Sequence, residues 1–197
     1  MLVDPDGKEI IPKLWRKSTE KGTVLVEKYR SMVNFVNAMT AFGKTTWGKH
    51  IISSFVPQGY THYGVKGNGK YGDIDLIINE YNIDNPQLQA RALLSKGVVI
   101  GGSFSVRKGE DNKLCFVMKI DASVKESEMA ETIVHELTLH GATIDKIVSV
   151  YRNQGVDAAI EFAHKSSEEQ EHRNNKWLYE QTKKELLHIN PEYSQSF

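Results

Sequence analysis

The chain has 197 residues, which is enough for one sizeable hydrophobic core, and we expect a single main domain. Hydrophobic residues make up 40% of it and charged residues 25%, and the 25 Lys and Arg residues balance the 25 Asp and Glu residues. This balance argues against a nucleic-acid-binding protein, which normally carries a basic surface. No apolar stretch has the length of a membrane span, and we expect no signal peptide in this sequence.

The first half of the chain predicts mostly helical structure. In chain order we expect an amphipathic helix over residues 19–39, a short helix ending near residue 55, a loop over 57–72, a strand over 72–81 and a short helix over 85–95. The first helix follows from apolar residues at i, i+3, i+4, i+7 spacing, and the loop is rich in glycine and tyrosine.

The second half predicts a β-hairpin followed by two long helices. Residues 98–106 and 114–120 are apolar, β-branched and aromatic, and a polar segment with a glycine joins them, as in a hairpin. One helix is expected from a capping box at Ser123 to about Gln154, and another over residues 157–187. Together these elements predict an α+β fold with N-terminal helices, a small, mainly antiparallel sheet with a hairpin, and two long helices.

The first long helix contains the most informative motif of the chain, His135-Glu136-x-x-x-His140. Two neutral imidazoles are suitable zinc ligands, and a glutamate beside them can take a proton from metal-bound water. The motif therefore suggests a zinc hydrolase, although it is one residue longer than the familiar H-E-x-x-H pattern.

The extra residue has a geometric consequence. In a regular helix, residues at i and i+5 lie about 140° apart, which is too wide for easy joint coordination of one ion. Two outcomes remain open: either the helix contains a π-bulge that absorbs one residue, or His135 and His140 do not bind metal together.

The motif resembles the expanded His-Glu-Leu-Leu-Gly-His motif of the dipeptidyl peptidase III family of zinc peptidases. Both histidines, the glutamate and Leu137 match, whereas the family's glycine before the second histidine is Leu139 here. The resemblance is confined to this motif. It implies a zincin-like site in which His135 and His140 are zinc ligands and Glu136 is the general base.

A third protein ligand is needed, because catalytic zinc normally has three protein ligands and a water. In the last helix, His164, Glu168 and His172 follow i, i+4, i+8 spacing, with Glu171 at the edge of their stripe. Gluzincin-type peptidases take a glutamate from a downstream helix, which favours Glu168, whereas histidine suits zinc equally well, which favours His172. The sequence leaves open which of the four is the ligand, and the others are candidates for orienting a ligand imidazole.

The remaining histidines and the single cysteine have simpler interpretations. His50, His62 and His188 have no partners at ligand spacing, so we expect them to be surface or packing residues. Cys115 lies in an apolar run, which predicts a packed thiol and not a nucleophile.

The chain starts with a turn-like segment, Val3-Asp4-Pro5-Asp6-Gly7. It resembles the segment that closes the conserved core of RHS-repeat polymorphic toxins, just before their variable toxin domain. The resemblance implies that residues 1–10 are a remnant of this boundary and that residues 11–197 form one metallopeptidase-like toxin domain. It further implies a bacterial effector that is secreted, or delivered to a target cell within a larger exported protein, and a cognate immunity protein.

The leading hypothesis is therefore a zinc-dependent peptidase with Zn²⁺ as cofactor and a protein or peptide as substrate, acting as a toxin domain. A first alternative is a non-catalytic interaction module of an RHS protein, in which the histidines are incidental. A second alternative is a metal-dependent nuclease toxin, which the neutral net charge disfavours because such domains usually need a positive field to hold a polyanion.

Overall fold

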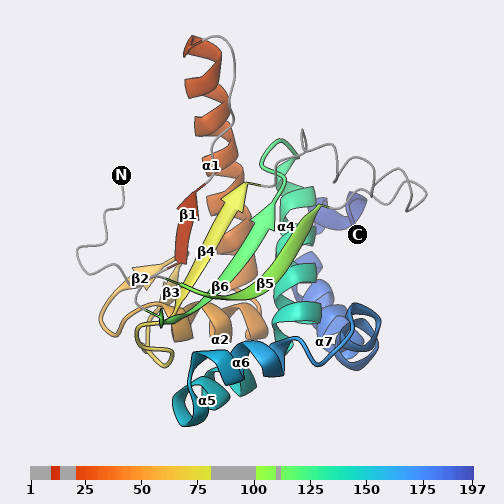
Figure 1. Ribbon diagram of the computed structural model, residues 1–197. Helices are drawn as coiled ribbons and strands as arrows, with labels where there is room; N and C mark the ends of the chain where they lie inside the picture. The colour runs from red at the N-terminus through yellow and green to blue at the C-terminus, as the bar shows by residue number, and fades with distance from the viewer. Residues whose placement is uncertain (1–9, 14–20, 81–100, 110–111) are drawn as a thin grey trace, which may run out of the picture.

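The structure, a computed structural model, describes residues 10–13, 21–80, 101–109 and 112–197, except for the side chains of residues 11–13 and 21–30. The segment that resembles the RHS boundary and the helix expected over residues 85–95 lie outside these residues. The fold class is α+β, as the sequence predicted (Figure 1).

The helices and strands have the following bounds. The helices are α1 (Lys21–Gly43), α2 (Thr46–Phe55), α4 (Glu126–His135), α5 (Ile144–Gln154), α6 (Val156–Ala163) and α7 (Glu168–Ile189), followed by a 3-10 turn at Pro191–Gln195. The strands are β1 (Ile10–Lys13), β2 (Thr61–His62), β3 (Val65–Lys66), β4 (Asp75–Glu80), β5 (Gly102–Lys108) and β6 (Leu114–Ile120). Each helix of the described residues is too short or too polar to span a bilayer.

The main sheet has four strands in the order β1-β4-β6-β5, and β2 pairs with β3 in a separate antiparallel ribbon. Strands β5 and β6 form the predicted hairpin, with Phe104 opposite Met118. However, β1 pairs with β4 and β4 with β6 in parallel, so the main sheet is mixed and not mainly antiparallel. Parallel neighbours require a crossover, which α1 and α2 provide between β1 and β4. Hydrophobic patterns indicate strands, but not which strands become neighbours.

The core lies between the sheet and the helices, with α1 and α4 on one face of the sheet (Figure 1). Successive side chains of a strand point to opposite faces, so alternate residues of β6 enter the core. This core consists of large apolar side chains, among them Leu76, Ile78, Phe116, Met118, Phe35, Phe42, Ile52, Phe55, Met129 and Ile133. The thiol of Cys115 is buried, in agreement with a packing role.

The long C-terminal helix expected over residues 157–187 is in fact two helices, α6 and α7, because the chain turns at His164. Ser167 caps α7, and its hydroxyl accepts a hydrogen bond from the backbone N–H of Gln170 at 3.3 Å. A serine side chain that binds backbone N–H groups favours a helix start over a helix interior. The single stripe of His164, Glu168 and His172 predicted from the sequence is therefore broken after its first member.

Candidate metal centre

The helix that carries the His-Glu motif changes its hydrogen-bonding pattern within the motif. Helix α4 ends at His135, residues Glu136–His140 form a π-helical turn, and a 3-10 turn at Gly141–Thr143 leads into α5. A π-helical turn accommodates one extra residue, and it brings the imidazole centroids of His135 and His140 to 5.5 Å from each other. The structure thus contains the π-bulge that the spacing of the two histidines requires for joint coordination.

Helix α7 brings a third imidazole to this pair. The Nε2 atom of His172 lies 3.1 Å from Nε2 of His140, and the ring centroid of His172 is 5.0 Å from that of His135. One nitrogen atom from each of the three rings lies within 4.8 Å of the other two. His135, His140 and His172 are therefore close enough to bind one metal ion; we call these residues the histidine triad.

The triad has the chemistry of a metal site. In tetrahedral coordination with Zn–N bonds of about 2.0–2.1 Å, ligand nitrogens are roughly 3.4 Å apart, and the Nε2 atoms of His140 and His172 are already near this separation. Burial, together with the neighbouring histidines, lowers the pKa of His135 to about 4. His135 is thus a neutral imidazole near pH 7, which is the protonation state that binds metal.

Glu171 holds one ring of the triad in place. The Nδ1–H group of His140 donates a hydrogen bond to Oε2 of Glu171 at 2.8 Å, and both side chains are largely buried. Burial alone would lower the pKa of His140, but the hydrogen bond to Glu171 and the negative charges of Glu136, Glu171 and Glu168 together raise this pKa. Protonation at Nδ1 leaves the Nε2 lone pair directed toward His172, as expected for a carboxylate that orients a ligand imidazole.

The other two candidates for the third ligand lie nearby but outside the triad. Glu168 is the first residue of α7, is exposed, and lines the same cleft as the triad. His164 ends α6 and also lines this cleft. Of the four candidates from the sequence, the structure places His172 in the triad, Glu171 behind His140, and Glu168 and His164 at the cleft wall.

Glu136 is buried beside the triad. Its side chain opens onto the cleft, only 4% of the residue is exposed, and its Oε2 atom has no hydrogen-bond partner among the described residues. Burial raises the pKa of Glu136 to about 7, with a smaller opposing effect from His140. A carboxylate with a pKa near neutrality is well suited to accept a proton and return it.

The cleft itself has a volume of about 720 Å³ and is bounded on one side by β5 and the preceding Gly101. Strand β5 is the edge strand of the main sheet on the side of the cleft. A Cβ atom on Gly102 would lie 2.6 Å from Cγ2 of Thr132 and 3.0 Å from Oε1 of Glu136. A glycine is therefore required for β5 to pass so close to the motif helix.

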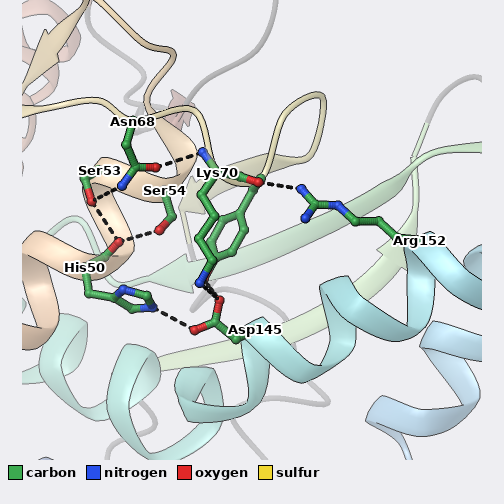
Figure 2. Close-up of polar contacts among 8 residues, drawn as sticks. His50, Ser53, Ser54, Asn68, Lys70, Asp145 and Arg152 are labelled. Carbon is green, nitrogen blue, oxygen red and sulfur yellow. Dashed lines mark hydrogen bonds and ion pairs between the residues drawn. The ribbon is translucent and has the colours of Figure 1, made fainter.

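A second polar cluster surrounds Asp145 in the first turn of α5 (Figure 2). Its carboxylate accepts hydrogen bonds from His50 Nε2 at 2.8 Å, Lys70 Nζ at 2.5 Å and the hydroxyl of Tyr71 at 3.1 Å. Arg152, two turns further along α5, donates a hydrogen bond to the backbone carbonyl of Lys70. The cluster fastens α5 to α2 and to the loop that precedes β4. His50, which was expected to be a surface or packing residue, belongs to this cluster through its contact with Asp145.

Two residues that the sequence did not single out contact the backbone of the motif. Trp47 of α2 and Asn175 of α7 donate hydrogen bonds to carbonyl groups of the π-helical turn. Trp47 is 90 residues away in sequence, and no local pattern links it to the motif.

No protein-family model, no curated protein and no solved structure matches this chain.

Proposed function

We propose that this chain is a zinc-dependent peptidase. The observation that carries the proposal is the convergence of the histidine triad with the buried carboxylate of Glu136 in one cleft. Three histidines form a known ligand set for catalytic zinc, which keeps a fourth position for water or substrate. Zinc bound there would polarise a substrate carbonyl and lower the pKa of a water molecule.

In this proposal Glu136 is the general base. Its unpartnered Oε2 atom would accept a proton as the water oxygen bonds to the carbonyl carbon of the peptide. Glu136 would then deliver this proton to the amide nitrogen, and the C–N bond would break to give a carboxylic acid and an amine. Glu171 would keep His140 oriented throughout, because it binds the ring nitrogen that faces away from His172.

The edge strand β5 supports a peptide as the substrate class. An extended peptide can add to an exposed sheet edge through main-chain hydrogen bonds. Residues of β5 from Gly102 to Val106 line the cleft that also contains the triad. A peptide paired with β5 would therefore pass next to Glu136 and the histidines.

The same proposal includes the biological setting that the resemblance to RHS-repeat toxins implies. The domain would be delivered to a target cell as part of a larger exported protein, and a cognate immunity protein would protect the producing cell. The resemblance of residues 3–7 to the RHS core boundary is the support for this part.

The proposal predicts different effects for the base and the ligands. Glu136→Gln should keep zinc but lose peptidase activity by at least about 100-fold, because a general base contributes about 10²- to 10⁴-fold. His135→Ala should lose both zinc and activity. Glu168→Gln is the matched control, since Glu168 lines the cleft outside the triad, and it should retain zinc and at least partial activity.

The measurement is cleavage of a proteome-derived peptide library by the zinc-loaded protein, followed by mass spectrometry. A fully active Glu136→Gln protein contradicts the mechanism. A zinc-loaded wild-type protein that leaves every peptide intact contradicts the assignment of peptidase activity.

A further inference from the structure

In the π-helical turn the carbonyl group of Leu137 lacks the backbone N–H that would bind it in an α-helix. In an α-helix the N–H of Gly141 would donate to the carbonyl of Leu137, four residues earlier. Here it donates to the carbonyl of Glu136, and the N–H of Ile144 donates to the carbonyl of Gly141. A buried carbonyl group requires a partner, so donors from other helices can stabilise the bulge.

Trp47 supplies the first of these donors. Its indole Nε1–H group donates a hydrogen bond to the carbonyl of Leu137 at 2.7 Å. The indole ring packs against His50, with ring centroids 5.0 Å apart, and His50 binds Asp145 at the start of α5. Helix α2 therefore holds the motif helix at two points, at the π-helical turn through Trp47 and at the start of α5 through His50.

Asn175 supplies the second donor. Its Nδ2 group donates a hydrogen bond to the carbonyl of Leu139 at 2.6 Å. Asn175 lies on α7 three residues after His172, so the two side chains project from neighbouring positions of the same helix face. This contact fixes α7 against the π-helical turn at the point where His172 meets His140.

We propose that Trp47 and Asn175 are positioning residues of the metal centre, which hold the π-helical turn in the register that aligns His140 with His135 and His172. This inference rests on the proposed function, because it assumes that the triad binds a metal ion. Neither residue belongs to the triad itself. Without the two donors, the motif helix would satisfy the carbonyl of Leu137 by returning to α-helical bonding, and His140 would rotate away from His135.

The test compares substitutions that remove one donor and keep the size of the side chain. Trp47→Phe loses the indole N–H, and Asn175→Asp replaces the amide donor with an oxygen. Trp177→Phe and Asn174→Asp are matched controls on α7, because both side chains are exposed to solvent. Asn175→Gln restores an amide donor and should recover part of any loss.

Two readouts separate a positioning role from a general loss of structure. The first is Zn²⁺ affinity by competition with a chromogenic chelator, and the second is the visible absorption spectrum of bound Co²⁺, which reports coordination geometry. Far-UV circular dichroism of the metal-free proteins shows whether each variant is folded. Each donor variant should bind Zn²⁺ about 10- to 100-fold more weakly, as is typical when groups behind metal ligands are removed, and should change the Co²⁺ spectrum.

The possible failures are distinguishable. A folded Trp47→Phe or Asn175→Asp protein with wild-type Zn²⁺ affinity and Co²⁺ spectrum overturns the positioning role of that residue, while the proposed metal site stands. Equal losses in Trp177→Phe and Asn174→Asp would also overturn it. If the wild-type protein itself binds neither Zn²⁺ nor Co²⁺, the proposed function fails and this inference fails with it.

Discussion

Three neighbouring side chains contact the imidazole of His140 in the candidate metal centre. Its Nδ1–H group is fixed by Glu171, its Nε2 atom faces His172, and its ring lies against that of His135. These contacts come from α4 and α7, so the imidazole has both its tautomer and its direction set before any metal binds. A preset ligand of this kind loses little conformational entropy on binding.

Removing the carboxylate behind His140 should therefore weaken metal binding without removing a ligand. We expect Glu171→Gln to lower Zn²⁺ affinity about 10- to 100-fold, because the ring loses its charged hydrogen-bond partner. Competition with a chelator measures the change. Glu169→Gln is the control on the same turn of α7, where an exposed carboxylate pairs with Arg173. Equal affinities for the Glu171→Gln and wild-type proteins would show that Glu171 has no part in the site.

At the residue scale the sequence predicted much of the site. Residue types and spacing singled out His135, Glu136 and His140, and His172 and Glu171 were among the named candidates for partners. The choice among those candidates was not readable, because it depends on where the turn between α6 and α7 places the start of α7. The sequence did contain a signal for that turn, since Ser167 followed by Gln170 three residues later is typical of a helix start.

The next scale is that of the motif helix, which is built from four pieces with different hydrogen-bonding patterns. Helix α4 packs its apolar side into the core through Met129 and Ile133, and α5 does so through Ile147 and Val148. The irregular stretch between them carries Glu136 and His140. The Asp145 cluster fastens the far end of this stretch, so it contributes to the geometry of the centre without touching it (Figure 2).

Asp145 should make a pH-dependent contribution to stability. Burial alone would raise its pKa, but hydrogen bonds from Lys70 and His50 outweigh burial and lower this pKa below its usual value. A carboxylate with a lowered pKa stabilises the folded state above the pKa of the unfolded chain, about 4, and this contribution is lost as the pH falls further.

We therefore expect Asp145→Asn to reduce the free energy of unfolding by about 1–2 kcal/mol at pH 7, and by progressively less below about pH 4. We expect this change in the free energy of unfolding to be modest because the side chain of Asp145 is 38% exposed to solvent. Chemical denaturation of the metal-free proteins at several pH values measures it. Asp157→Asn, at an 84% exposed position paired with Lys108, should change stability by less than about 0.5 kcal/mol. A difference that stays constant from pH 7 to pH 3 contradicts this account.

Elements with strong local signals were predicted well. The hairpin of β5 and β6, the short helix α2 and the amphipathic α1 all follow from periodicity and turn residues. The sequence predicted a π-helical turn only on the condition that His135 and His140 bind one ion together. It shows the spacing of the histidines but not the donors that stabilise the bulge. One donor, Trp47, is 90 residues from the carbonyl group that it binds. The other, Asn175, lies on α7, 36 residues from its own acceptor.

At the scale of the whole molecule, the elements that form the core can be told apart from those that line the cleft. The motif helix packs into the core beside β4, β6, α1 and α2. Residues of β5 and α7 line the cleft. The sequence did not indicate the parallel pairing of β1, β4 and β6. Strand neighbours that are distant in sequence are set by tertiary packing, which leaves no local pattern.

The most direct test of the central claim is the metal content of the purified protein by elemental mass spectrometry, with two histidine variants for comparison. His140→Ala removes a member of the triad, whereas His164→Ala removes a histidine that lines the same cleft outside it. We predict about one zinc per chain in the wild-type and His164→Ala proteins and its loss in His140→Ala. A wild-type protein that holds no zinc after zinc is supplied, or a His140→Ala protein that holds as much as the wild type, would contradict the account.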